Sequence, residues 1–455
     1  MRDFRSESFW LSTLEEDLKP RPALKGNQEA DVVIVGAGYT GLWTAYYLLE
    51  NEPHLRIAIC EAGISGAGAS GRNGGWCMGM AEGVKEFLHD PKTREGGLDL
   101  SRALFGCVDE VERVARHEGI DCHFRKGGTL QIARFEKQEQ EQKAHRAQLM
   151  AWGLGPDDYQ WLSKEGLDQR LRVPGARGAL FSPHVAAIHP ARLVRGLARA
   201  VESRGVRIFE NAPVRQIEKR GVQTDQGRIQ ADWVVLATEA YMARLPGYKR
   251  RMVPMHSMMV ATEPLPSHLW DEIGLGERET FGGLERITTY GQRTADDRIA
   301  YGSRGMYYYG SAIRERFSAR NPLFEQVRAS LVDLLPMLRD VKITHRWGGP
   351  LGLPRNRVPL VWADSEARLA MAGGYLGEGV GASNLMGRTL ADLLLDRQTD
   401  RVQLPWVRDG LSNWEPEPLR WIGITAARSL MDRMDKREAA GKATNRLLES
   451  VLDRL

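Results

Sequence analysis

Cysteine is scarce in this sequence, and the few cysteines lie far apart. Four occur in 455 residues, Cys60, Cys77, Cys107 and Cys122, with no CxxC pair and no close Cys/His spacing. Structural zinc sites and small disulfide-stapled domains need closer or paired cysteines. We therefore interpret the four as reduced, partly buried thiols, and we expect neither a disulfide framework nor a metal site.

A long, purely apolar run is also missing. Residues 32–49 carry no charge over 18 positions, which reaches the threshold for a membrane span, but three glycines, two threonines and three tyrosines interrupt them. The first seven residues carry charges where a signal peptide has an apolar core. The sequence therefore predicts a cytoplasmic protein without a transmembrane segment.

Neither sign of charge dominates the chain. Lys and Arg number 63 against 59 Asp and Glu, the formal net charge is +4, and no basic block stands out. Nucleic-acid-binding chains usually show a basic stripe or patch, so we predict no nucleic-acid partner. With 455 residues, 42% of them hydrophobic, the chain is long enough for two or three domains or one interleaved pair.

What the sequence does contain is a strand, turn, helix and strand between Asp31 and Glu61. A β-branched run at 31–35 precedes the turn Gly36-Ala37-Gly38-Tyr39-Thr40-Gly41, helix formers follow at 42–50, and a second strand is expected at 56–60. In such a unit the first glycine makes the tight turn, the second admits a pyrophosphate, and the third lets the helix pack on the sheet. The helix N-terminus then favours the anionic pyrophosphate.

Glu61 lies 20 residues (61 − 41) after the last of these glycines. An acid at about this spacing reaches the ribose hydroxyls of a dinucleotide and disfavours a 2′-phosphate. FAD or NAD therefore fits better than NADP. The alternative is an ordinary glycine-rich turn, which would need neither the flanking strand and helix nor the acid.

Two more glycine-rich stretches follow later in the chain. Residues 66–75 combine five glycines with Ser70, Arg72 and Asn73. This composition favours a loop whose backbone wraps a cofactor. The alternative, a flexible surface loop, would not need Arg72 and Asn73 beside the glycines. Residues 373–381 again follow a short strand and precede a helix, expected at 382–396. The N-terminus of that helix would stabilise negative charge on a ligand ring.

The rest of the chain gives weaker signals. Residues 1–30 look like an arm anchored by Phe9-Trp10-Leu11, residues 84–172 are helix-rich, and a charged helix from about Thr425 ends the chain as a docked helix or an oligomer contact. Residues 252–345 contain β-like stretches at 253–262, 287–290, 299–301 and 305–309 and an expected helix at 323–338, and they are the best candidate for a sheet that covers a substrate. Its possible site residues are His256, Tyr290, Arg304, Tyr307 and Tyr308. The alternatives are ordinary: a satisfied core histidine, tyrosines packing on the sheet, and a surface ion pair.

The order of these motifs resembles the FAD-dependent D-amino-acid oxidase superfamily. The resemblance is carried by residues 31–61, the loop Gly68-Ala69-Ser70-Gly71-Arg72-Asn73-Gly74-Gly75, the strand end Val234–Tyr241, Trp347-Gly348-Gly349, and Gly373–Gly381. It is strongest to the amine-oxidising branch, which includes γ-glutamylputrescine oxidoreductases and aminophosphonate oxidoreductases. It extends over most of the chain.

The resemblance implies an α/β (α+β, two-domain) protein, in which a Rossmann-like FAD-binding domain is interleaved with a mixed-sheet substrate domain and followed by a helical C-terminal tail. We expect the FAD domain at 28–83, 173–250 and 346–398, the substrate domain at 84–172 and 251–345, and the tail at 399–455. The expected cofactor-binding residues are Gly36, Gly38, Tyr39, Thr40, Gly41, Glu61, Ala69, Ser70, Arg72, Asn73, Gly74, Gly75, Val214, Ala237, Thr238, Gly377, Gly379, Val380 and Gly381. The expected catalytic residues are His256, Arg304, Tyr308 and Glu378.

The activity that the resemblance implies is oxidation of the C–N bond of a primary or secondary amine to an imine, with hydride transfer to flavin N5, hydrolysis of the imine, and reduction of O2 to H2O2. An aminoalkylphosphonate or a γ-glutamyl-polyamine is a candidate substrate. Three alternatives stay open: an amine dehydrogenase with a quinone or protein acceptor, a flavin monooxygenase, and a flavin-binding subunit of a larger complex. The oligomeric state is also open.

Two departures from the family pattern bear on the cofactor. Monomeric sarcosine oxidases of the superfamily carry a cysteine for covalent flavin attachment near the position of Gly349 and an oxygen-activating lysine near that of Ala300. Because this sequence has neither, we expect noncovalent FAD, and the electron acceptor is undecided between O2 and another molecule. A lysine that binds the substrate carboxylate would fall near Gly381, so sarcosine itself is not the expected substrate.

Overall fold

The computed structural model describes residues 2–439 and 441–442, and these form two compact units. The first unit comprises the chain up to Phe124 together with Ile188–Pro254 and Gly349–Trp414, and the second comprises Arg125–Ala187, Met255–Gly348 and the described residues from Glu415 onward. The expected mixed α/β fold with a helical C-terminal tail is confirmed. By packing, residues 84–124 and 399–414 group with the first unit, whereas residues 173–187, 346–348 and the described residues from Glu415 onward group with the second.

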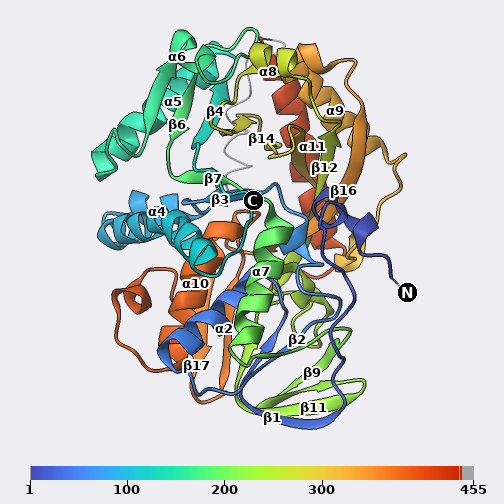
Figure 1. The fold of residues 1–455 in the computed structure, drawn as a ribbon. Helices are drawn as coiled ribbons and strands as arrows, with labels where there is room; N and C mark the ends of the chain where they lie inside the picture. The colour runs from blue at the N-terminus through green and yellow to red at the C-terminus, as the bar shows by residue number, and fades with distance from the viewer. Residues whose placement is uncertain (1, 440, 443–455) are drawn as a thin grey trace. The chain divides into compact units, whose positions relative to one another are not determined.

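The first unit is built on a mostly parallel sheet in the order β17-β18-β11-β1-β2-β8 (Figure 1). Its central strand β1 is longer than the apolar run at 31–35 suggested, because it pairs with β11 from Gly26↔Gly227 onward. The strands are β1 (Gly26–Val35), β2 (Ile57–Cys60), β8 (Arg207–Phe209), β9 (Val214–Glu218), β10 (Gly221–Thr224), β11 (Gly227–Leu236), β17 (Leu360–Asp364) and β18 (Leu369–Gly373). Strands β9 and β10 extend β11 as an antiparallel meander.

Helices cover this sheet, and α2 lies between α7 and α10 (Figure 1). Helices α2 and α10 approach closely at Gly387, where a β-carbon would lie 2.6 Å from Cβ of Trp43. The helices of the unit are α1 (Phe9–Ser12), α2 (Tyr39–Asn51), α3 (Val84–His89), α4 (Arg94–His117), α7 (Pro190–Ser203) and α10 (Gly379–Leu394), and its short strand β3 spans Trp76–Met78. Helix α10 starts three residues earlier than expected, inside the third glycine-rich stretch.

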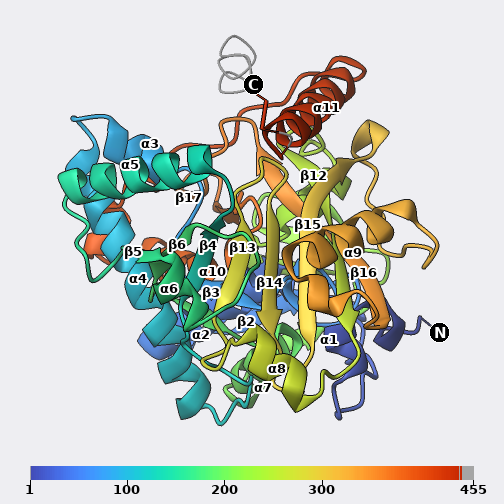
Figure 2. The ribbon, with the colours of Figure 1, turned by 90° about the horizontal axis from the view of Figure 1, so that it is seen from above.

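The second unit holds a sheet in the order β16-β12-β15-β14-β13-β4-β6-β5 (Figure 2). The two β-like pieces expected at 299–301 and 305–309 form one strand, β15, because β12 pairs with it on both sides of a register shift at His256/Ser257 and β14 pairs with its first half. The strands are β4 (Thr129–Ala133), β5 (Gln160–Ser163), β6 (Gly178–Ser182), β7 (Val185–Ala187), β12 (Met252–Thr262), β13 (Thr280–Gly283), β14 (Thr289–Arg293), β15 (Ile299–Tyr307) and β16 (Ile343–Pro354). The apolar core of the unit includes Phe281, Tyr301 and Phe324.

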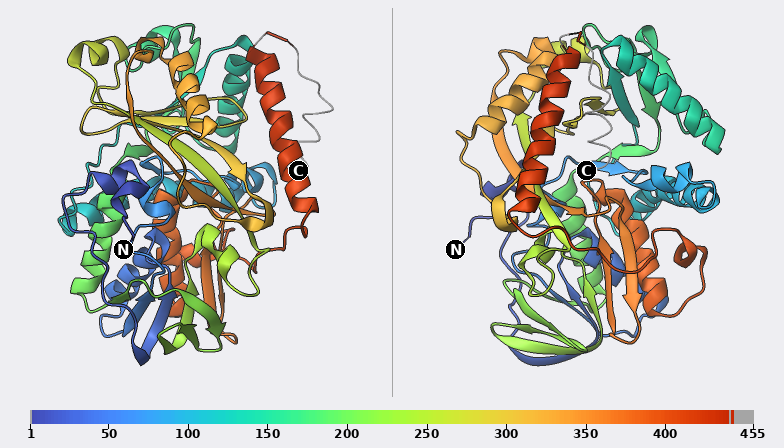
Figure 3. Two further views of the ribbon diagram at one scale, coloured as in Figure 1. Left: turned by 90° about the vertical axis from the view of Figure 1, so that its right-hand side faces the viewer. Right: turned by 180° about the vertical axis from the view of Figure 1, so that it is seen from behind.

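The helices of the second unit are α5 (Glu136–Trp152), α6 (Lys164–Asp168), α8 (Ser267–Ile273), α9 (Pro322–Leu334) and α11 (Leu419–Ala439). Helix α9 is shorter than expected, since Pro336 cannot continue its hydrogen-bond ladder and opens a separate 3-10 turn. The C-terminal helix α11 docks beside β15 (Figure 3). Arg286, which lies between β13 and β14, pairs with two acids of this helix, Asp435 at 3.1 Å and Glu438 at 2.8 Å. Among the described residues, no helix combines the length and apolarity needed to cross a membrane.

Candidate functional site

The carboxyl ends of four neighbouring parallel strands meet at one edge of the first unit's sheet. Strands β2, β1, β11 and β18 run parallel in this order. The residues that directly follow them are Glu61, Gly36, Ala237 and Gly374. Because ligands of α/β sheets bind beyond the carboxyl ends of the strands, this edge is the candidate site, and it brings the first and third glycine-rich turns together.

The first glycine turn has the geometry that its spacing predicted. Gly36 has a φ of +107°, its N–H bonds to the Cys60 carbonyl at 2.8 Å, and a β-carbon there would lie 2.6 Å from the Ala237 carbonyl oxygen. A β-carbon on Gly41 would overlap the Gly36 carbonyl oxygen. Both positions therefore need glycine, one for the backbone turn and the other for close packing of α2 on that turn.

The N-terminus of α2 joins the other two glycine-rich segments. The Tyr39 N–H donates to Oγ of Ser70 at 3.0 Å, and Oγ1 of Thr40 lies 2.7 Å from the Tyr375 hydroxyl. Space is tight here, since a β-carbon on Gly38 would lie 2.9 Å from Oγ of Ser70. Ser70 of the second segment and Tyr375 of the third are thus within hydrogen-bond reach of the first turn of α2, and a helix N-terminus favours an anion.

Glu61 directly follows β2 and turns back toward the glycine turn. Its carboxylate accepts N–H groups from Ala37 at 2.9 Å and from Gly63 at 2.8 Å. Burial raises the pKa of this carboxyl, while the two N–H groups act in the opposite direction. Val214 is the first residue of β9. Two residues earlier, the Ala212 N–H donates to the Glu61 backbone carbonyl at 2.8 Å.

The second glycine-rich loop is folded by its own side chains. The Asn73 amide donates to the carbonyls of Ser70 at 3.0 Å and Ala69 at 3.2 Å, and its oxygen accepts the Gly75 N–H at 2.8 Å. The Ile188 N–H donates to the Gly75 carbonyl at 2.8 Å. The loop, Gly74 included, is therefore an ordered part of the first unit.

Arg72 in this loop is buried, with 2% of its surface exposed, and it pairs with the buried carboxylate of Glu7. Its Nε also donates to the Ala67 carbonyl at 2.6 Å. Sequence reasoning missed Glu7, because nothing in residues 1–30 signals a partner for an arginine 65 positions later.

Glu239 is a second residue that sequence reasoning missed. It follows β11 with a φ of +47°, and its carboxylate accepts N–H groups from Gly374 at 3.1 Å and Tyr375 at 2.9 Å. Burial raises the pKa of this carboxyl. In the sequence, Glu239 is an acidic residue among small residues at the end of a strand, and this pattern is too common to indicate what the side chain does. In the fold it ties the end of β11 to the third glycine-rich turn.

The remaining predicted residues of the third stretch lie at the N-terminus of α10. Glu378 is the N-cap residue, Gly379 begins the helix, and Val380 is buried. A β-carbon on Gly381 would overlap the Met78 carbonyl oxygen of β3. Gly377 has a φ of +105°, a region that favours glycine. This turn and helix start place backbone N–H groups at the same end of the sheet as the first glycine turn.

These residues fit a dinucleotide. A β-carbon at Gly36 or at Gly41 would overlap a neighbouring backbone carbonyl, and the N-terminus of α2 lies beside both glycines. Oγ1 of Thr238, at the end of β11, is buried and has no hydrogen-bond partner among the described residues. A buried hydroxyl of this kind normally has a partner, and a bound ligand would supply one.

In the second unit, His256 is fully buried and both of its ring nitrogens contact the backbone. Nδ1 lies 3.3 Å from the Met306 carbonyl oxygen, and Nε2 accepts the Arg314 N–H at 3.0 Å. Burial lowers its pKa to about 4, helped by the charge of Arg314. The ring is therefore neutral at pH 7 and matches the alternative of a satisfied core histidine.

Arg304 and Tyr308 lie at the end of β15 in the same unit. Arg304 is opposite Ser257 in the register with β12, and Oγ of Ser257 lies 2.5 Å from the Tyr290 hydroxyl. Tyr308 stacks edge-on against His256, with 4.9 Å between ring centroids, and carries the Arg314 guanidinium over its face at 3.9 Å. The Tyr307 hydroxyl instead donates to Glu417.

No cluster of three or more His, Cys, Asp or Glu side chains suited to a metal occurs within the part of the chain that the structure describes. All four cysteines are free and buried.

Comparison with known proteins gives a consistent result. The family model described as DAO, FAD dependent oxidoreductase, matches residues 31–393. The γ-glutamylputrescine oxidoreductase of Escherichia coli (strain K12) is 29% identical over 395 residues, which cover 82% of this chain and 86% of that protein. The glycine oxidase of Geobacillus kaustophilus is 26% identical over 382 residues, 81% of this chain and 94% of that protein. Its crystal structure superposes with a TM-score of 0.68 and 22% identity, covering 84% of this chain and 99% of that one.

Proposed function

Because the chain belongs to the DAO family of FAD-dependent oxidoreductases, we propose that it oxidises the C–N bond of a primary or secondary amine to an imine, which water hydrolyses to an aldehyde and an amine or ammonia. FAD is its cofactor, as the sequence predicted. Bound FAD would accept the hydride from the amine's α-carbon, and O2 would reoxidise the reduced flavin and become H2O2.

The observation that carries this proposal is the meeting of the glycine-rich turns at one sheet edge, in a chain similar over most of its length to γ-glutamylputrescine oxidoreductase. That relative's name suggests the substrate class, an amine with a polar, anionic tail such as a γ-glutamyl-polyamine. An aminoalkylphosphonate shares this chemistry. The first unit would then be the FAD domain and the second the substrate domain.

The proposed cofactor contacts are the predicted ones in the three glycine-rich segments, with Val214, Ala237 and Thr238. Backbone N–H groups at the start of α2 would take the pyrophosphate, Glu61 the ribose hydroxyls, and Oγ1 of Thr238 another polar atom. We propose noncovalent binding, because residue 349 is glycine and not cysteine.

For the substrate, we propose Arg304 as the group that binds the anionic tail, because a planar guanidinium matches a carboxylate or phosphonate with two hydrogen bonds. Tyr308 and Glu378 remain proposed site residues. His256 we now assign to the framework of the second unit, since both its nitrogens contact the backbone. A neutral amine that loses a hydride needs positioning and exclusion of water more than a strong base.

The test is an anaerobic titration of the purified yellow protein with 2-aminoethylphosphonate, γ-glutamylputrescine and uncharged alkyl amines, followed by air. Bleaching of the flavin band by one amine, and its return with stoichiometric peroxide, supports an amine oxidase. Bleaching with slow return in air, but fast return with a quinone, identifies a dehydrogenase instead. If no amine bleaches the flavin, the proposed reaction is wrong.

Replacing Arg304 with Met tests the anionic-tail assignment. We expect the half-saturating concentration of the anionic amine to rise about 10- to 100-fold, the usual effect of losing a charge-assisted pair, while an uncharged amine changes little. Arg320→Met is the matched control, because Arg320 is exposed on a loop of the same unit. An equal loss for charged and uncharged amines would contradict the assignment.

A further inference from the structure

The N-terminal arm, residues 2–25, precedes the part of the chain that the family model matches, yet it is built into the first unit. Phe9, Trp10 and Leu11 are at most 1% exposed, and Leu24 is fully buried. Glu7, a charged residue, is only 3% exposed. A segment that buries this much apolar surface and one carboxylate is a structural component and not a loose tail.

Three consecutive residues of the second glycine-rich loop are held by the arm. Oγ of Ser8 donates to the Gly71 carbonyl at 2.7 Å, the Glu7 carboxylate pairs with Arg72, and the Trp10 indole N–H donates to the Asn73 carbonyl at 2.7 Å. The arm therefore fixes the backbone of the loop on both sides of its arginine.

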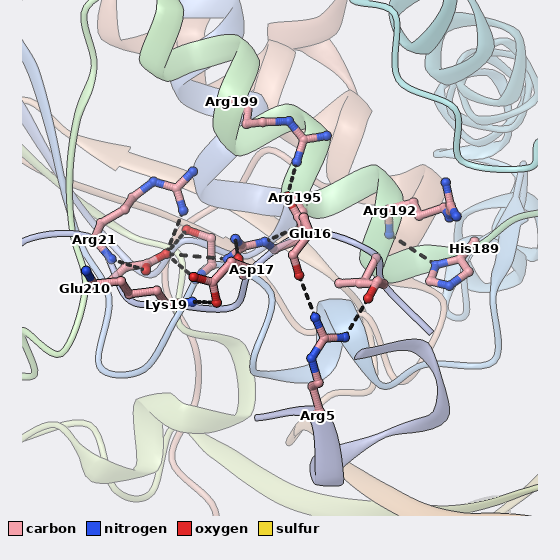
Figure 4. Close-up of polar contacts among 12 residues, drawn as sticks. Arg5, Glu16, Asp17, Lys19, Arg21, His189, Arg192, Arg195, Arg199 and Glu210 are labelled. Carbon is pink, nitrogen blue, oxygen red and sulfur yellow. Dashed lines mark hydrogen bonds and ion pairs between the residues drawn. The ribbon is translucent and has the colours of Figure 1, made fainter. Parts of the chain in front are cut away.

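The other end of this loop is tied to the arm through Glu210. The Glu210 carboxylate is fully buried and accepts both the N–H and the hydroxyl of Ser65 at 2.7 Å. It also accepts the Arg21 guanidinium at 2.9 Å (Figure 4). Ser65 directly precedes the loop, so arm residues 7–10 and 21 hold it at both ends.

The arm itself is anchored on α7. Glu16 receives the guanidinium groups of Arg195 at 2.7 Å and Arg199 at 2.5 Å (Figure 4). Oγ1 of Thr13 lies 3.0 Å from Nε2 of His189, the N-cap residue of that helix. The loop is thereby connected to a rigid helix through the arm.

The Glu7–Arg72 pair is the contact with the largest energetic consequence. Both side chains are completely buried, and Arg2 also reaches Glu7, at 2.9 Å. Removing one partner of a buried pair leaves an uncompensated charge, which costs far more than losing a surface pair. Without Glu7, Arg72 could keep its charge only by moving toward water, and the loop would move with it.

We propose that Glu7 is a positioning residue of the FAD site, which acts through Arg72 to hold residues 66–75 in the conformation that receives the cofactor. A loop with five glycines loses much conformational entropy on ordering. Contacts that order it in advance raise the affinity of a ligand that needs the ordered form. FAD affinity therefore depends on an arm that lies outside the family's matched region.

The test compares Glu7→Gln with Glu15→Gln. Both remove one negative charge from the arm, but the Glu15 side chain is 92% exposed, whereas that of Glu7 is buried. We expect the FAD dissociation constant, measured by fluorescence titration of each apoprotein, to rise at least about 10-fold in Glu7→Gln and to stay within twofold of wild type in Glu15→Gln. Hydrogen exchange of amides 66–75 in the apoprotein should accelerate in Glu7→Gln alone.

Two milder variants keep the proposal testable if Glu7→Gln folds poorly. Trp10→Phe removes the indole donor to Asn73 together with part of a buried ring, and Ser8→Ala removes the hydroxyl that bonds to Gly71 and also caps α1. Each should weaken FAD binding several-fold. Glu7→Asp keeps the charge and should recover part of the affinity lost in Glu7→Gln. A lower unfolding temperature with an unchanged FAD dissociation constant, or an equal loss in Glu15→Gln, would overturn the proposal and leave the proposed amine oxidation untouched.

Discussion

At the scale of single residues, burial decides what a titratable group can do. His256 is a candidate by residue type and Glu61 by its spacing from the glycine turn, and backbone groups contact both side chains in the fold. Glu61 stands beyond the end of a strand beside the glycine turn, where a ligand is expected, whereas His256 lies inside the second unit with 0% exposure. Spacing within a motif thus led to a predicted ligand contact, whereas residue type alone led to a framework residue.

The buried neutral state of His256 predicts a pH dependence of stability. Its folded pKa of about 4 lies below the unfolded value of about 6.5, so its contribution is complete above pH 6.5 and is lost as the pH falls toward 4. We expect the free energy of unfolding to drop by about 2 kcal/mol between pH 7 and pH 4.5 on account of this residue alone. Urea unfolding at the two pH values measures the drop.

The control for this prediction is a pair of variants. His256→Gln should remove that part of the drop, whatever its effect on stability at pH 7, because glutamine does not titrate. His117→Gln should leave the drop as in wild type, since the His117 side chain is 62% exposed. An unchanged drop in His256→Gln would mean that the ring is not held neutral.

At the scale of elements, the strand, turn and helix around Gly36 form one rigid support for the candidate site. Gly41→Ala would push α2 away from the turn, because its β-carbon overlaps the Gly36 carbonyl oxygen. We expect this variant to be purified with little or no FAD and to unfold at a lower temperature than wild type. Absorbance of the purified protein and thermal unfolding provide the two measurements.

Gly106→Ala is the matched control for the glycine prediction. Gly106 lies inside α4, and no atom outside its local backbone comes within 4 Å of a β-carbon there. Alanine should therefore stabilise the protein by about 0.5–1 kcal/mol through helix propensity, with full FAD content. If Gly41→Ala also kept its FAD, the close approach of α2 to the turn would not be required for binding.

At the scale of the whole molecule, cofactor binding should stabilise the first unit selectively. A ligand that binds only the folded state at 100 times its dissociation constant adds about 2.7 kcal/mol to the free energy of unfolding. With the predicted contacts all in the first unit, FAD should move the unfolding transition of that unit more than that of the second. Hydrogen exchange with and without FAD distinguishes the two units.

FMN is the natural comparison ligand, because it lacks the adenosine half whose ribose Glu61 is expected to contact. We expect FMN to give clearly less protection of the first unit than FAD at the same concentration. Equal protection by both ligands would indicate that the contacts assigned to the adenosine half do not form.

The sequence by itself determined the features that depend on local backbone chemistry. The turn at Gly36, the helix that follows it, the acid at Glu61 and the order of three glycine-rich segments follow from glycine geometry and short-range periodicity, although α2 begins at Tyr39, three residues before the expected 42. Together with family resemblance, they sufficed to predict the fold class and FAD. The two short strands expected along β15 and the late start assigned to α11 were inaccurate, because pairing and docking extended these elements beyond their local signals.

Only the tertiary structure decided which distant residues meet. Glu7 with Arg72, Glu239 with Gly374 and Tyr375, and Glu210 with Ser65 are pairs separated by tens to more than a hundred positions. No local rule links such residues, since each is an ordinary acid until folding buries it beside its partner. The physical reason is that burial removes water as a partner, so a charge must find its counterpart within the fold.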